Sequence, residues 1–300
     1  MQTGLILVIF SAFSFSIGIV IVRRTSAAAG ESFSVMAVSV LVGIPFFAIA
    51  VTLAGDWYKV LMVSWRVLAL LGSAGIIHFI IGRLLGYSAY RIIGANKATP
   101  YIMTNPFYTL LFSFLFLGEN ITVFIIAGVL CMFLGAALTS AEKKTVSATN
   151  EKKILSVEMK GILLALGAAL CWGITPILIK PSVEEIGSAI AASFISYCAA
   201  GVVMFGLLMR KSLRQQVTQL PLIKSLSPMA LAALFTAAGQ LLMFTALGKN
   251  PASIVTPLMS TQVIFIFFLS LLVNRKTEIF SWKVGFGMVA TLAGTFLLFQ

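Results

Sequence analysis

One positively charged side chain stands inside a long apolar run of the chain, where an ionic group is costly. Arg83 lies in the sequence Ile81-Gly-Arg-Leu-Leu-Gly-Tyr87. An arginine at the centre of a membrane span costs at least about 2.5 kcal/mol on insertion scales, so its side chain must face protein or a wet cavity. Two interpretations stay open: Arg83 binds an anion in a solute pathway, or it extends to the membrane interface or to a backbone carbonyl. Tyr87 and Tyr90 continue the same helix face at i+4 and i+7.

His78 is the single histidine of the sequence and lies five residues before Arg83. On a regular α-helix this spacing separates the two side chains by roughly 140°. We therefore expect one of them to face a cavity while the other packs. With a reference pKa near about 6.5, His78 is the candidate for a proton carrier. The alternative is a hydrogen-bonded packing residue.

Polar and aromatic residues recur at three- and four-residue spacing in the apolar run 98–117. This spacing predicts one polar face of a single helix, which could bind a solute by hydrogen bonding and stacking. Hydrogen bonds between helices are the alternative, particularly for Ser and Thr. The residues of this face are Tyr101, Thr104, Asn105 and Tyr108, and similar faces contain Thr236, Gln240 and Phe244, Thr256 and Ser260, and Ser193, Ser196 and Tyr197.

The composition requires lipid as the main solvent. Of the 300 residues, 60% are hydrophobic and 10% are charged, and the mean hydropathy is +1.05. A soluble domain has about 45–50% apolar and about 25% charged residues. The net charge of +12 comes from Lys and Arg between the apolar runs, which is typical of membrane topology signals. A nucleic-acid partner is excluded because the chain has no soluble basic region with interleaved aromatics.

The apolar runs predict an all-α integral membrane protein with ten transmembrane helices. Each run is close to the length of about 20 residues that one crossing needs. Helices satisfy their backbone polar groups within each span, as lipid demands. The runs are 4–22, 33–55, 67–88, 98–117, 121–139, 160–179, 187–209, 228–247, 252–273 and 283–299.

The two halves of the sequence repeat. Gly4, Phe15 and Arg23 align with Gly161, Trp172 and Lys180 at a constant offset of 157. This predicts one five-helix repeat over 1–140, a polar linker over 141–158 and a second five-helix repeat over 159–300. Because five is odd, the second repeat must be inverted in the membrane. Inverted repeats are a recurring transporter architecture with a substrate site near the midplane.

The Lys and Arg residues are distributed unequally between the two sides of the membrane. The connections after the odd-numbered spans hold 16 of them and the opposite side holds four. The positive-inside rule therefore places the central linker in the cytoplasm and both termini outside.

Two motifs resemble a known family. Pro106-Phe-Tyr-Thr-Leu-Leu-Phe-Ser-Phe-Leu-Phe-Leu-Gly-Glu119 is followed by Gly128 and Gly135, and Leu170-Cys-Trp-Gly-Ile-Thr-Pro-Ile-Leu-Ile-Lys180 opens the second repeat. Together they resemble the EamA-type branch of the drug/metabolite transporter superfamily across the whole chain. The sequence departs from the pattern at Phe15-Ser16, where the family has Trp-Gly, and at Asn274-Arg275-Lys276, which lacks Gly-Glu. Family members are often described with both termini in the cytoplasm, unlike the charge count.

The resemblance implies a secondary transporter that exports or exchanges small metabolites such as amino acids. It also implies that the third, fourth, eighth and ninth helices surround the cavity. The related small multidrug resistance proteins use a membrane-embedded carboxylate, but all nine acidic residues here lie outside the span centres, which disfavours carboxylate-based proton antiport. The candidate substrate-binding residues are His78, Arg83, Tyr87, Tyr101, Asn105, Tyr108 and Gln240.

Other functions find little support in the sequence. With one histidine and no embedded carboxylate, a catalytic triad or acid pair cannot be built, so we expect no enzyme. No nucleotide-binding loop is present, and Cys131, Cys171 and Cys198 have no metal-ligand spacing. We therefore expect no cofactor and no metal.

The expected partners are membrane lipid and a small-molecule substrate, and a homodimer stays open. The expected location is the cell membrane. A lipid-handling flippase and a non-transporting membrane assembly partner remain alternatives. Pro106, Pro176 and Pro257 could form hinges or simple bends, and Glu119 could cap a helix.

Overall fold

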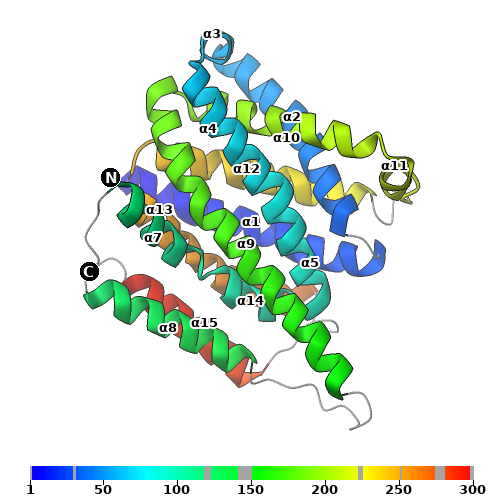
Figure 1. The fold of residues 1–300 in the computed structure, drawn as a ribbon, viewed down its shortest axis with the longest axis vertical. Helices are drawn as coiled ribbons and strands as arrows, with labels where there is room; N and C mark the ends of the chain where they lie inside the picture. The colour runs from blue at the N-terminus through cyan, green and yellow to red at the C-terminus, as the bar shows by residue number, and fades with distance from the viewer. Residues whose placement is uncertain are drawn as a thin grey trace.

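The computed structural model describes residues 2–29, 32–117, 123–140, 151–221, 226–250, 252–273 and 281–297, which fold into helices without a strand (Figure 1). The first half contains α1 Gln2–Ala29, α2 Ser32–Ala54, α3 Trp57–Leu61, α4 Trp65–Gly75, η1 Ile76–Gly82, α5 Arg83–Ile93, α6 Ala95–Ile102, α7 Asn105–Leu117 and α8 Val123–Ser140. The second contains α9 Glu151–Ile186, α10 Ala189–Leu208, α11 Lys211–Thr218, α12 Ser227–Leu247, α13 Ala252–Leu258, η4 Met259–Thr261, α14 Gln262–Val273 and α15 Trp282–Leu297. The predicted all-α class is confirmed.

Seven of the described helical segments are long and apolar enough to cross a membrane. They are Ile6–Arg24, Ser32–Ala54, Trp65–Ile93, Ser156–Ile186, Ala189–Leu208, Ser227–Leu247 and Val255–Val273. The other three predicted spans correspond to the broken pair α6 and α7, to α8 and to α15. The chain is therefore a multi-pass membrane protein, and the count of ten spans stays a prediction.

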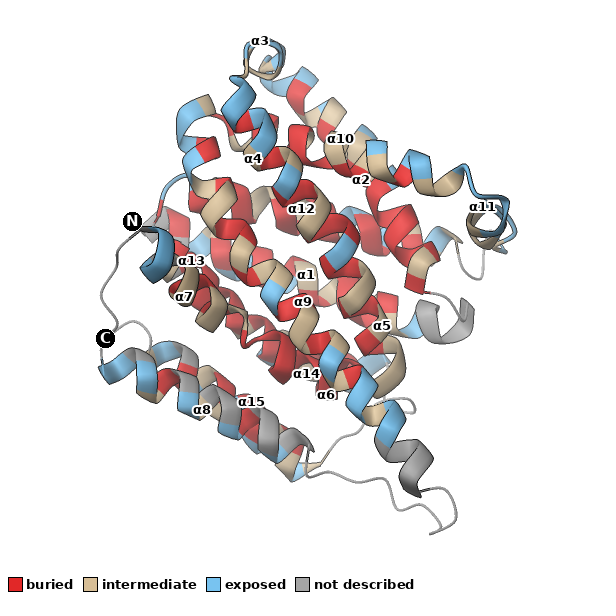
Figure 2. Cartoon of the chain, viewed as in Figure 1, coloured by how far each residue is buried: buried red, intermediate tan, exposed pale blue. Residues whose placement is uncertain are grey.

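The surface of the molecule is apolar where lipid would contact it. Buried residues concentrate on the inner faces of the central helices, and exposed residues on the outer faces and on the peripheral helices α8 and α15 (Figure 2). Leu53, Trp65 and Leu272 each expose at least four-fifths of their surface. A soluble protein rarely leaves so many large apolar side chains exposed, so these faces are suited to lipid.

The connections contain more helix than the sequence analysis expected. Helix α9 begins at Glu151, so residues 151–158, predicted as the end of a polar linker, are helical. Residues 141–150 lie outside the described part of the chain. The short helices α3 and α11 lie between the predicted spans 33–55 and 67–88 and between 187–209 and 228–247. Helix α3 lies at one end of α2 and α10, and α11 at the other (Figure 1).

The two halves interlock reciprocally. Helix α1 packs on α12 and α14, while its counterpart α9 packs on α4, α5 and α7. Helix α2 pairs with α10 and α8 pairs with α15. Each first helix of a half thus packs into the opposite half. This is the arrangement that two inverted repeats produce when they share one core.

Equivalent residues of the two halves make equivalent contacts. The hydroxyl of Ser11 on α1 donates to the carbonyl of Gly239 on α12 at 2.7 Å. A Cβ atom at Gly239 would lie 3.0 Å from the ring of Phe15, and one at Gly82 would lie 2.6 Å from the indole of Trp172. Phe15 and Trp172 differ by 157 in number, as do Gly82 and Gly239. The same offset found in the sequence therefore relates contacts in the structure.

Two helices expected to be continuous are broken at corresponding places. The predicted span 98–117 splits at Met103 and Thr104 into α6 and α7. In the second half, the 3₁₀ turn η4 separates α13 from α14. Pro100 and Pro257 each lie within the helix that precedes its break. A proline therefore precedes each interruption.

Candidate functional site

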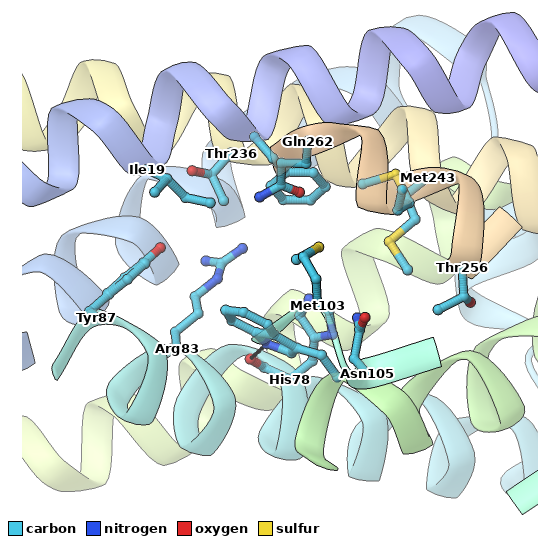
Figure 3. A pocket seen from close by; sticks show the side chains of 13 residues that line it. Ile19, His78, Arg83, Tyr87, Met103, Asn105, Thr236, Met243, Thr256 and Gln262 are labelled. Carbon is cyan, nitrogen blue, oxygen red and sulfur yellow. Dashed lines mark hydrogen bonds between the residues drawn. The ribbon is translucent and has the colours of Figure 1, made fainter. Parts of the chain in front are cut away.

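A cavity lies between the two halves at the level of the helix breaks (Figure 3). It leaves about 70 Å³ for the centres of water-sized molecules, several times the roughly 10–15 Å³ that one water needs. The space suits a small solute. The lining residues are Phe15, Ile19, His78, Arg83, Tyr87, Met103, Asn105, Trp172, Thr236, Met243, Thr256, Met259 and Gln262.

Arg83 projects into the cavity from the first turn of α5. Its side chain is 2% exposed. One terminal nitrogen donates to the Ser39 hydroxyl at 3.0 Å and the other to the Tyr197 hydroxyl at 2.6 Å. The guanidinium carbon lies 4.6 Å from the centre of the Phe79 ring and 5.3 Å from that of Tyr197. These contacts hold the guanidinium inside the protein, so the predicted alternative of an arginine that snorkels to the interface is wrong.

No described carboxylate balances the charge of Arg83. The ion pairs in the described part of the chain are Asp56–Lys59, Lys97–Glu158 and Lys180–Glu184, all away from the cavity. Neutral hydroxyls and ring faces stabilise the cation less than an anion would. The cavity is therefore electropositive and suited to a negatively charged group.

His78 lines the same cavity as Arg83, contrary to the expectation that the two would face apart. The reason is local: residues Ile76–Gly82 form a π-helix rather than an α-helix. Its i→i+5 hydrogen bonds widen the turn, so residues five apart come closer to one face. The ring nitrogen Nδ1 of His78 lies 3.0 Å from the Thr175 hydroxyl, and the Trp172 indole donates to the His78 carbonyl at 3.3 Å.

Gln240 lies behind the cavity wall. It is fully buried and is absent from the lining. Its amide nitrogen lies 4.0 Å from the Met243 sulfur. Gln240 therefore contacts one lining residue, while a direct contact with a solute would require the cavity wall to move.

The predicted polar face of the run 98–117 does not exist as one surface, because the helix breaks at Met103 and Thr104. Asn105 lines the cavity, whereas Tyr101 and Tyr108 do not. Tyr101 is 5% exposed. Tyr108 packs beside Gly173, where a Cβ atom would lie 2.6 Å from the Cβ of Tyr108. Of the seven predicted site residues, four line the cavity: His78, Arg83, Tyr87 and Asn105.

Sequence reasoning missed the apolar part of the lining. Met103 lies in the break after α6, Met243 in α12 and Met259 in η4, and nothing in their spacing separates them from packing or lipid-facing residues. Trp172 could have been found, since it belongs to the Trp-Gly motif that opens the second repeat. Gln262 could have been found as the residue 157 after Asn105.

Comparison with solved structures places the fold among known ones. A crystal structure of another protein shares 15% sequence identity with this chain, with a TM-score of 0.54 and 96% of each chain covered. At this identity the likeness concerns the fold alone. No curated protein sequence matches the chain.

The family comparison covers both halves separately. The EamA-like transporter family matches residues 2–141 and again residues 159–300. The two matched segments coincide with the two halves that interlock around the cavity, and the match spans nearly the whole sequence. The chain belongs to the EamA-like transporter family.

Proposed function

We propose that this membrane protein is a secondary transporter that moves a small polar or anionic metabolite by alternating access. The observation that carries the proposal is Arg83, a buried cation that lines a cavity between the repeats and has no described carboxylate partner. A bound anion would supply the missing countercharge through short, charge-assisted hydrogen bonds. An amino acid fits this description through its carboxylate.

Both halves contribute to the cavity, as alternating access requires. Arg83 and Asn105 come from the first half, and Thr236 and Thr256 from the second. A rocking motion of one half against the other would expose these residues to either side of the membrane in turn. Transport in this form is export or exchange and needs no nucleotide.

The same geometry favours a carrier over an enzyme. The His78 ring contacts the Thr175 hydroxyl, the His78 carbonyl accepts from the Trp172 indole, and no described acidic side chain lines the cavity. General acid–base chemistry would need a partner group to orient and stabilise the imidazolium. We therefore propose that the solute leaves the cavity chemically unchanged.

Proteoliposomes that contain only this protein provide the test. Thermal stability of the purified protein is first screened against carboxylates, amino acids and neutral analogues, and a stabilising compound is then used in flux assays. We expect Arg83→Ala to weaken binding of the anion by at least roughly tenfold, because hydrogen bonds to charged groups contribute about 1.5–3 kcal/mol. Arg214→Ala, which removes an exposed arginine of α11, is the matched control and should transport normally.

The alternatives give different results. A non-transporting assembly partner would show no flux of any screened solute while remaining folded. A flippase would move fluorescent lipid analogues between leaflets and would be inhibited by headgroup compounds. Unchanged anion flux in a folded Arg83→Ala protein would show that the buried arginine is structural.

A further inference from the structure

The cavity has two chemically different ends. Arg83 and Tyr87 project from one side, and Asn105 and Thr256 lie at the other, with Met103 between them (Figure 3). The first end presents a positive charge. The second presents neutral oxygen atoms. A solute that fills the cavity therefore meets different chemistry at each end.

The oxygen atoms of the second end lack hydrogen-bond partners. Both the amide oxygen of Asn105 and the hydroxyl of Thr256 are buried and make no hydrogen bond. Thr256 is 2% exposed and lines the cavity. More than nine-tenths of buried polar groups in proteins are paired with protein or water. Two unpaired atoms at one end of a cavity indicate the place where a ligand group or its waters bind.

Thr256 differs from the other threonines of the described helices. Thr236, which lines the same cavity, donates its hydroxyl to the Ala232 carbonyl at 2.7 Å. The hydroxyls of Thr99, Thr245 and Thr291 likewise bond to the carbonyl four residues earlier. Local bonding of this kind is usual for threonine within a helix. The Thr256 hydroxyl is buried and makes no such bond.

The charge of the lining limits what can bind at this end. No described acidic side chain lines the cavity, and Arg83 already contributes a positive charge. A cationic group at this end of the ligand, away from the ligand's own carboxylate, would have no countercharge, and burying an unpaired charge is strongly unfavourable. The group that meets Asn105 and Thr256 is therefore an uncharged hydrogen-bond donor.

Besides polar side chains such as His78 and Gln262, the cavity has an apolar and deformable part of its lining. Met103, Met243 and Met259 line it together with the rings of Phe15 and Trp172. Methionine is unbranched and polarisable, so it adapts to ligands of different shape. Such a lining accommodates a short aliphatic chain.

We propose that the solute is a two-ended carboxylate. Its anionic group binds at Arg83, a short apolar chain lies along the methionines, and a hydroxyl or amide group at the far end donates to Asn105 and Thr256. This inference rests on the proposed transport function and specifies its substrate class. It separates the solute from plain alkanoates, which lack the distal donor, and from carboxylates with a distal ammonium group, which add a charge.

Matched pairs of ligands test the proposal on the purified protein. The pairs are the unbranched alkanoates from propionate to heptanoate and their ω-hydroxy derivatives, with affinities measured by calorimetry. We expect the hydroxylated member to bind about threefold to tenfold more tightly at the chain length that spans the cavity, which is the effect of one neutral hydrogen bond. The corresponding ω-ammonium compound should bind more weakly than the hydroxyl compound.

Three variants test which residues cause the preference for the hydroxylated ligand. Thr256→Val keeps the shape of the side chain and removes the hydroxyl, so we expect it to abolish the preference for the hydroxylated member of each pair. Asn105→Ala should reduce the preference in the same way. Thr236→Val is the matched control, since its hydroxyl is already bonded to the backbone, and it should keep the ratio of the two affinities.

The outcomes separate this proposal from the one on which it rests. Equal affinities of both members at every chain length, or a preference that survives in Thr256→Val, would overturn the two-ended substrate and leave an anion carrier in place. Tighter binding of the ω-ammonium compound would overturn the uncharged donor. If the wild type binds none of these compounds and transports no screened anion, both proposals fail.

Discussion

The buried guanidinium of Arg83 relies on partners from two other helices. Ser39 belongs to α2 and Tyr197 to α10, and the ring of Tyr197 lies against Gly43, where a Cβ atom would come within 2.0 Å of it. Arginine suits this setting better than lysine, because its delocalised charge is less strongly hydrated and stacks on aromatic faces. The cavity therefore depends on residues that never contact the solute.

Replacing Tyr197 with Phe tests this dependence. The variant keeps the ring that lies over Gly43 and removes the hydroxyl that accepts from Arg83. Leaving a buried charged donor without its acceptor costs about 1–3 kcal/mol or more, so we expect a clear fall in the melting temperature of the detergent-solubilised protein. Tyr58→Phe changes an exposed tyrosine of α3 and should melt like the wild type. Identical melting of both variants would contradict the role of Tyr197.

The sequence predicted the ionisable residues of the site better than it predicted the apolar lining or the residues that hold Arg83. Arg83 and His78 stand out because charged and titratable groups are rare in apolar runs. The methionines of the lining resemble every other apolar residue in their spans. That Ser39 and Tyr197 hold Arg83 depends on how α2, α5 and α10 pack, which no local pattern in one sequence specifies.

At the scale of helices, the two breaks shape the cavity. Met103 immediately follows α6, Met259 begins the turn after α13, and both line the cavity. A broken helix at this depth exposes backbone polar groups, which is tolerated where they line a cavity or are buried in protein. The breaks therefore belong where a solute would bind, and they provide places at which each half can bend.

Pro257→Ala tests the contribution of the second break. The alanine restores a backbone donor and removes the clash with the preceding turn, so α13 should become more rigid just before the break. We expect transport to fall severalfold or more while the protein stays folded, measured as initial flux in proteoliposomes. Pro181→Ala is the control, because Pro181 is exposed and lies inside α9, which continues through it. Equal flux in both variants would show that the break has no part in transport.

The lengths of the spans were predictable, whereas their interruptions were not. Apolar runs record how much chain lies in lipid, but proline in such a run does not determine whether the helix breaks. Pro176 lies inside α9, which continues through it, while Pro100 and Pro257 precede breaks. The difference depends on neighbouring helices that replace the lost hydrogen bond.

At the scale of the whole molecule, polar contacts tie the two halves together at both ends. At the end where α3 lies, Lys59 pairs with Asp56 and donates to the Gly187 carbonyl, and Ser188 donates to Asp56. The hydrogen bond from Lys59 holds the pKa of Asp56 below its usual value, so this carboxylate stays ionised at neutral pH. At the opposite end, Lys97 pairs with Glu158 at 2.5 Å.

Alternating access requires the polar contacts at each end of the molecule to break in turn. We expect a thiol crosslinker between Asp56→Cys and Ser188→Cys, in a background without the native cysteines, to stop transport, and a reducing agent to restore it. A crosslink between Lys97→Cys and Glu158→Cys should do the same, since each traps one state. The measurement is flux before and after reduction, and either single-cysteine protein is the control. Undiminished flux with a crosslink in place would contradict the rocking motion.

The sequence showed the repeat, but it did not show how the two halves pack together. A constant offset of 157 predicted two related halves, but only packing shows that α1 and α9 each enter the opposite half. The same offset relates Arg83 to Gln240. The arrangement of helices is therefore nearly two-fold symmetric, while the charged residue Arg83 of the cavity belongs to the first half alone.

The charge of Arg83, which no described carboxylate balances, makes the cavity sensitive to the membrane voltage. When a monovalent anion occupies the cavity beside Arg83, the pair has no net charge; when the cavity is empty, a positive charge remains inside the low-dielectric core. One elementary charge moved across a full membrane potential of 100 mV involves about 2.3 kcal/mol. Under the proposed mechanism, the membrane voltage acts mainly on the return of the empty protein, and a carrier that returns loaded avoids that step. Exchange of one anion for another is thus the cycle that this arrangement favours.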